Sequence, residues 1–282
     1  MELSELAQHY AKKYSSVAAV IGYGSRVCGK PNESDDIRLR SHFDLWLVVG
    51  SYEEFYGSDM KDRRNLLTLL FNPFDEARAH AFLNRINPNF YEERFDDVKV
   101  KYGVVSADDF VRLCQPDARM YLKGRMQKPV RLLYAADEET KEKIEDAIFE
   151  ARQDGVMKAF TLMPEGYEHW MVEPAFDGLI KKVLRLSYYA DIRPEKKTKV
   201  DDIFEASKDE LREMYFPFFK HVASLLAMGV SDEQRKRHAD IEVKPYLRRN
   251  KWFSGLMSLK NGLTNKFAVS YLVGKIMRSR KK

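Results

Sequence analysis

Residues 17–25 read VAAVIGYGS, a short apolar run rich in β-branched residues that ends in a glycine turn. Such a run is typical of a buried strand. A strand that leads into glycine lets backbone amides approach an anion, because no Cβ stands in the way. The stretch therefore predicts a strand over 17–23 and a phosphate-binding turn at Tyr23, Gly24 and Ser25.

Strands and helices alternate through the first third of the chain. Residues 43–49 (FDLWLVV) form a second apolar run, and residues 97–105 (DVKVKYGVV) alternate polar and apolar positions like a half-buried strand. This alternation indicates an α/β or α+β first domain. Helical periodicity follows over 59–84, 136–153, 174–190, 200–228 and 231–240. We expect an α+β domain over 1–130, a helical domain over 131–242 and a basic tail over 243–282.

Charge separates the tail from the rest. The whole chain carries +5, from 48 basic and 43 acidic residues, and the tail holds eleven of the basic residues and no acidic one. The remainder is therefore net acidic, so we expect no nucleic-acid partner. Two cysteines, Cys28 and Cys114, have no metal or redox spacing and exclude a disulfide scaffold.

The tail also has an amphipathic pattern. Trp252, Leu256 and Leu259 begin a helical stripe among lysines and arginines. Such a segment fits an anionic membrane surface, with docking on the protein's own core as the alternative. No targeting signal or membrane span is visible, so we expect an intracellular, peripheral membrane protein.

The candidate chemistry begins at Asp44, which opens the second strand nineteen residues after Ser25. A carboxylate on the strand beside a phosphate-binding turn suits Mg²⁺. Position 46 is Trp46 rather than a second acid, so another carboxylate would be needed; Asp97 shares a strand face with Lys101. The alternatives are a helix-capping Ser25, a surface Asp44 and a solvated strand face.

A basic stretch, KGRMQKPV, occupies residues 123–130. We expect Gly124 to break the preceding helix, and Pro129 to favour an extended Lys128 before a strand. Arg125 and Lys128 are candidate phosphate ligands. The alternative is an ordinary basic loop.

Together these pieces occur in a recognisable order. The order is Gly22-Tyr23-Gly24-Ser25, Phe43-Asp44, Lys101-Tyr102-Gly103-Val104-Val105-Ser106, Gly124-Arg125-Met126-Gln127-Lys128-Pro129-Val130, and Ser187-Tyr188 with Asp191-Ile192-Arg193. The sequence resembles the mitochondrial-type phosphatidate cytidylyltransferases, the translocator assembly and maintenance protein family. The resemblance implies a polymerase-beta-type nucleotidyltransferase domain, a helical, winged-helix-like domain and a membrane-binding C-terminal amphipathic helix. It also implies synthesis of CDP-diacylglycerol from CTP and phosphatidic acid, with Mg²⁺.

The resemblance assigns roles to individual residues. Tyr23, Gly24 and Ser25 would cradle the CTP phosphates, and Asp44 would be catalytic and bind Mg²⁺. The candidate second ligand, Asp97, comes from the strand pattern above and not from the resemblance. Lys101 and Lys128 would also be catalytic, and with Arg125 they would contact the triphosphate or the lipid phosphate. Asp191 and Arg193 would close the site from the second domain and bind the nucleotide.

Two departures from the family bear on the compartment. Residues 51–89 lack the histidine- and tryptophan-rich stretch of the mitochondrial members, and no mitochondrial targeting segment is visible. The setting is then the cytoplasmic face of a bacterial membrane, or the matrix side of the mitochondrial inner membrane if the family's eukaryotic setting applies.

The acceptor decides whether a base is needed. The phosphate of phosphatidic acid is already an anion, so its attack needs no proton abstraction, and we discount His42 as a base. Two alternatives stay open: a nucleotidyltransferase with a soluble or nucleic-acid acceptor, and a non-catalytic, membrane-associated nucleotide-binding adaptor.

Overall fold

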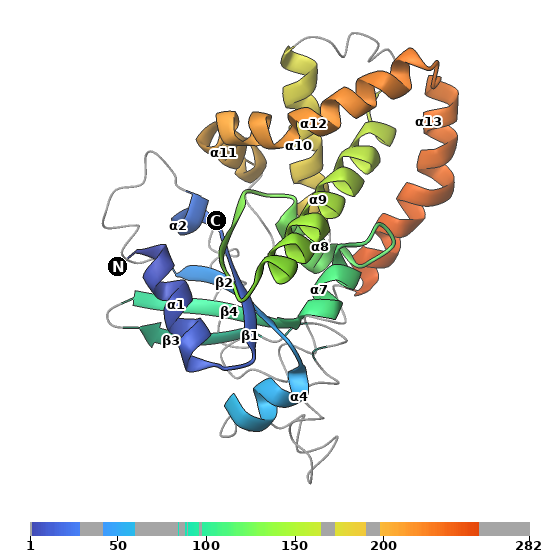
Figure 1. Ribbon diagram of the computed structural model, residues 1–282. Helices are drawn as coiled ribbons and strands as arrows, with labels where there is room; N and C mark the ends of the chain where they lie inside the picture. Colours follow the sequence, from blue (N-terminus) through green and yellow to red (C-terminus); the bar gives the residue numbers. More distant parts are fainter. Residues whose placement is uncertain are drawn as a thin grey trace, which may run out of the picture.

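The computed structural model describes residues 2–28, 42–59, 84, 88, 90–95, 98–164, 173–189 and 198–253. The predicted α+β fold is confirmed, with one mixed sheet and a large helical part (Figure 1). The first two strands, β1 (Val17–Tyr23) and β2 (Phe43–Val49), have the predicted bounds. The third is β4 (Val98–Ser106), within one residue of the prediction.

Among the described residues, five strands make the sheet, in the order β3-β4-β2-β1-β5. Strand β2 runs parallel to β4, and all other pairs are antiparallel. Strands β3 (Phe90–Phe95) and β5 (Val130–Ala135) form the edges. Strand β5 continues the sheet past the predicted domain boundary at residue 130, and the division of the chain into domains stays a prediction.

One face of the sheet packs on α1 (Leu3–Lys13), α4 (Tyr52–Glu54) and the π-helical turn η1 (Phe55–Asp59) (Figure 1). The strands alternate as their sequences require. Along β2, Leu45 and Leu47 lie in the core on this face, whereas Trp46 and Val48 lie in the core on the other.

The other face packs on α7 (Ala107–Cys114), α8 (Met120–Met126) and α9 (Glu138–Thr161). Ser106 caps helix α7: its hydroxyl accepts a hydrogen bond from the Asp109 amide at 3.3 Å. Helix α9 runs beyond the predicted residue 153 to Thr161. Gly155 lies inside it, where a Cβ would stand 2.6 Å from Nε2 of Gln127.

The helical part comprises α10 (Glu173–Tyr189), α11 (Lys199–Ala206), α12 (Lys208–Ala227), α13 (Asp232–His238) and η3 (Ala239–Val243), which continues as helix to residue 253. Their shared core includes Leu179, Val183 and Phe204. The predicted single helix over 200–228 is wrong, because Ser207 has a non-helical φ of −135° that separates α11 from α12.

Gly124 also differs from the prediction. It lies inside α8 instead of ending a helix. A Cβ on Gly124 would stand 2.8 Å from the carbonyl oxygen of Ser187 in α10. The glycine therefore serves close packing of α8 on α10, which brings the basic stretch against the helical part.

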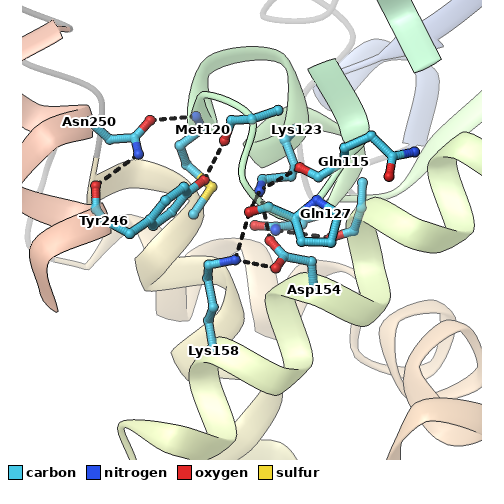
Figure 2. A network of polar contacts seen from close by, with 11 residues as sticks. Gln115, Met120, Lys123, Gln127, Asp154, Lys158, Tyr246 and Asn250 are labelled. Atoms are coloured by element: carbon cyan, nitrogen blue, oxygen red, sulfur yellow. Dashed lines mark hydrogen bonds and ion pairs between the residues drawn. The ribbon is translucent and has the colours of Figure 1, made fainter. Parts of the chain in front are cut away.

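A buried polar network joins α8, α9 and the last helix (Figure 2). The ammonium of Lys123 is fully buried and lies 2.8 Å from Asp154, and it donates to the carbonyl oxygens of Gln115 and Pro116. Lys158 pairs with the same carboxylate. From the last helix, Tyr246 donates to the carbonyl oxygen of Ala118 at 2.7 Å. The network holds α8, α9 and the last described helix together.

Candidate phosphate-binding site

One residue from each strand contributes to a row across the sheet. In order along the row these are Glu92, Lys101, Asp44, Tyr23 and Val130. Lys101 and Asp44 each lie two residues before Gly103 and Trp46 on their strands, so each pair shares a face of the sheet. Gly103 and Trp46 contact each other on the face covered by α7, α8 and α9, and Lys101 and Asp44 therefore lie on that face. The row therefore brings together three predicted site residues, Tyr23, Asp44 and Lys101.

The glycine turn lies directly against the carboxylate. Gly24 has a φ of +84°, and a Cβ on it would stand 3.0 Å from Oδ2 of Asp44. Ser25 follows as the first residue of the short helix α2 (Ser25–Cys28). Glycine is needed here for two reasons: the positive φ and the space that Asp44 occupies.

Arg125 lies over this row from α8. Its guanidinium carbon is 4.5 Å from the ring centroid of Tyr121 and 5.8 Å from those of Tyr23 and Phe90. Burial, reinforced by the negative charge of Asp44, raises the pKa of Tyr23, and Arg125 opposes this only in part. The Tyr23 hydroxyl therefore stays protonated and able to donate a hydrogen bond.

Lys128 extends the site toward the helical part. Its ammonium lies 3.5 Å from the ring centroid of Tyr188, in the last turn of α10. The residue before it, Gln127, is buried; it donates to the carbonyl oxygen of Ala151 at 3.0 Å and accepts from the Tyr215 hydroxyl at 2.6 Å. The stretch is thus a tightly held connection between α8 and β5.

Trp46 lies two residues after Asp44, at the position where a second acidic metal ligand would be expected. Its ring is fully buried, stacked on Tyr23 at 6.1 Å between centroids, and a Cβ on Gly103 would stand 2.4 Å from it. The position is therefore part of the core.

Glu92 was missed by the sequence analysis. It faces Lys101 from β3, and its Oε1 lies 3.1 Å from Nε2 of His42. The available signal was weak: residues 90–95 (FYEERF) carry aromatic residues typical of strands, but their three charged residues are consecutive and do not alternate with apolar ones.

Three predicted site residues, Asp97, Asp191 and Arg193, lie outside the described residues. Within the described ranges, no group of three or more histidine, cysteine, aspartate and glutamate side chains is arranged to hold a metal ion. Over the same ranges, no helix is both long and apolar enough to cross a membrane.

Taken together, a glycine turn, one carboxylate and cations from β4, α8 and the α8–β5 connection form a site suited to phosphate groups with a hard cation. A family model described as "Phosphatidate cytidylyltransferase, mitochondrial" matches residues 6–280. The chain belongs to this family, as the resemblance predicted.

Individual relatives agree with the family match. A protein from Caenorhabditis elegans is 25% identical over 220 residues, which cover 76% of this chain and 64% of the relative. A relative from Danio rerio is 27% identical, and the match covers 68% of this chain and 56% of the relative. A relative from Saccharomyces cerevisiae is also 27% identical, and the match covers 72% of this chain and 52% of the relative. All three are named "Phosphatidate cytidylyltransferase, mitochondrial". The chain thus matches less than two thirds of the length of these relatives.

Proposed function

We propose that this chain is a phosphatidate cytidylyltransferase that converts CTP and phosphatidic acid into CDP-diacylglycerol and pyrophosphate. The observation that carries the proposal is the contact between the Gly24 turn and the Asp44 carboxylate, with Arg125 over the same row. The names of the relatives supply the nucleotide and the lipid.

The reaction needs positioning and charge neutralisation more than proton transfer. An oxygen of the phosphatidate phosphate bonds to the α-phosphorus of CTP, and the bond from that phosphorus to the oxygen bridging the α- and β-phosphates breaks. The electron pair leaves with pyrophosphate. Since the acceptor is already an anion, no side chain must remove a proton, and His42 faces Glu92 instead of serving as a base.

The residues of the row have separate tasks in this scheme. The Gly24 turn offers backbone amides to the nucleotide phosphates, and the protonated Tyr23 beside it can donate a hydrogen bond. Arg125 neutralises phosphate charge from α8, and Lys101, across Asp44 from Tyr23, draws the second anion to the row.

Magnesium fits the residues present. Mg²⁺ is commonly bound through one or two carboxylates, with substrate phosphates and water completing its shell. Asp44 supplies one carboxylate beside the turn that would hold the phosphates, and Asp97 is our candidate for a second. When bound, Mg²⁺ would neutralise charge that develops on the departing pyrophosphate.

We also propose that the basic tail binds an anionic membrane surface from residue 251 onward. Its first part packs on the protein's own core through Val243, Tyr246 and Leu247. The last described helix ends at residues 251–253 with Trp252, whose side chain is 65% exposed. Tryptophan and lysine together favour the interface of an anionic bilayer. The relatives named above are eukaryotic and called mitochondrial, and they lend no support to a bacterial setting.

One experiment tests the proposed function. The purified protein is incubated with each labelled nucleoside triphosphate, Mg²⁺ and either phosphatidic acid or an oligonucleotide, while pyrophosphate release is followed. We expect release only with CTP and phosphatidic acid together. Release with a soluble or nucleic-acid acceptor instead would replace the lipid assignment. Nucleotide binding without release, in keeping with Trp46 at the second acidic position, would indicate a non-catalytic adaptor.

A further inference from the structure

Two lysines from distant parts of the chain lie against one aromatic ring. The ammonium of Lys128, just before β5, is 3.5 Å from the centroid of Tyr188. The ammonium of Lys199, the first residue of α11, is 4.6 Å from the same centroid. Tyr188 is half-buried in the last turn of α10. The three residues thus join the sheet, α10 and α11 at one point.

This arrangement concentrates positive charge. Two ammonium groups so close to one centroid are nearer to each other than the screening length of about 10 Å at 0.1 M salt, so they repel. The face of the Tyr188 ring offsets part of that repulsion through its negative quadrupole. Lys199 also stands at a helix N-terminus, where a cation is disfavoured. An anion bound between the two lysines would relieve that repulsion.

The register of the sheet indicates which anion fits. Lys128 lies two residues before Val130, which pairs with Tyr23 on the β5 side of Asp44. The Gly24 turn also follows β1, whereas Lys101 and Glu92 lie on the opposite side, on β4 and β3. In an in-line displacement the acceptor and the leaving group stand on opposite sides of the α-phosphorus. With that phosphorus at Asp44, the leaving group belongs on the side of β1 and β5.

We propose that Lys128 and Lys199, held on the ring of Tyr188, form a subsite for the two terminal phosphates of the nucleotide, the group that leaves as pyrophosphate. This inference rests on the proposed function, which it deepens by assigning α11 to nucleotide binding. Lys199 is a binding residue that the family resemblance did not supply, and Tyr188 is a positioning residue for both ammonium groups.

The test measures binding as well as turnover, with the full chain. Lys199→Gln should weaken binding of Mg²⁺–pyrophosphate and of CTP about tenfold and leave CMP binding unchanged. Tyr188→Phe keeps the ring and should behave like the unmodified protein, whereas Tyr188→Leu should resemble Lys199→Gln. The matched control is Lys220→Gln, which removes a lysine 4.7 Å from the exposed ring of Phe216 on α12 and should change none of these values.

The outcomes separate this inference from the proposed function. If Lys199→Gln binds pyrophosphate as the unmodified protein does, the subsite is refuted, even where CDP-diacylglycerol is made. The same holds if the variant raises only the KM for a soluble short-chain phosphatidic acid, because the lysines would then serve the acceptor. If no acceptor is used at all but Lys199→Gln still loses pyrophosphate binding, the proposed function fails and the anion subsite stands. Lys199 is the first residue of α11 and is only partly buried, so we expect Lys199→Gln to fold. This variant therefore tests the proposed subsite even if Tyr188→Leu does not fold.

Discussion

Gly24 and Asp44 are in direct contact: a Cβ on residue 24 would stand 3.0 Å from Oδ2 of the carboxylate. The contact arises because Tyr23 and Asp44 pair across β1 and β2, so the turn after β1 folds over the start of β2. The phosphate-binding turn and the candidate metal ligand are thereby positioned by the same pair of strands. Any change at residue 24 should therefore affect both stability and chemistry.

Gly24→Ala tests this coupling. The φ of +84° should cost about 1–2 kcal/mol of folding free energy for any residue with a Cβ, and the new methyl group would also displace Asp44. We expect loss of stability together with loss of most CDP-diacylglycerol synthesis. Urea unfolding and a pyrophosphate-release assay measure the two effects.

Gly229→Ala is the matched control. Gly229 also has a φ of +84°, but nothing lies within 4 Å of the place that its Cβ would take. This variant should lose similar stability and retain its activity. Equal loss of activity in both variants would show that strain alone, and not the contact with Asp44, explains the effect at residue 24.

Asp44→Asn tests the negative charge of the side chain while its size is kept. The amide keeps the size of the side chain but is a poorer ligand for a hard cation, so we expect at least about a 100-fold fall in kcat, comparable to removal of a key electrostatic group. His42→Ala, two residues away, should retain most activity because an anionic acceptor needs no base. Near-normal turnover by Asp44→Asn would contradict the proposed site.

The sequence predicted the strands of the site well, because their signals are local. Apolar, β-branched runs bounded by glycine located β1 and β2, and alternation placed Lys101 opposite the buried Val100 and Tyr102. The register that places Asp44 between Tyr23 and Lys101 could not be predicted in this way. It depends on strand order, which is set by packing between residues far apart in the chain.

Gly124 and Lys123 show what local signals miss. Glycine after a helical run favours a helix end, yet here it is tolerated inside α8 because the backbone of α10 passes at Ser187. Lys123 was part of a basic stretch in the sequence, and only the fold reveals that its ammonium is buried against Asp154. Likewise, the meeting of Lys128 and Lys199 at Tyr188 depends on how α10 and α11 pack against the sheet.

The buried Lys123–Asp154 ion pair predicts that the single and double variants differ in their free energy of unfolding. Asp154→Asn leaves the Lys123 ammonium without its charged partner, and loss of one partner of a buried pair costs about 3–5 kcal/mol. The double variant Lys123→Met/Asp154→Asn should recover part of this loss, because the unpaired charge is then removed. Urea unfolding of the single and double variants measures the difference, and a double variant less stable than Asp154→Asn would contradict it.

The same lysine predicts a pH dependence. Burial lowers the pKa of Lys123 to about 8 from its ordinary 10.5, although Asp154 partly opposes the shift. Between pH 8 and 10.5 the unfolded chain therefore binds more protons at this group, so the group's contribution to the free energy of unfolding rises with pH. The unfolding free energy of the unmodified protein minus that of Lys123→Met should therefore increase as the pH is raised from 8 to 10. A difference that stays flat or shrinks over this interval would contradict the lowered pKa.

Truncation after Phe253 tests the proposed membrane role of the tail. The cut must not fall earlier, because Asn250 is buried and its side-chain oxygen accepts a hydrogen bond from the Met120 amide at 2.7 Å. Residues 1–253 should keep the fold and CTP binding but lose most sedimentation with anionic vesicles, since each basic residue near such a surface contributes about 1 kcal/mol. Activity on a soluble short-chain phosphatidic acid should persist, whereas activity on vesicles falls. A truncated protein that sediments with anionic vesicles as the full chain does would show that the tail is not the membrane anchor.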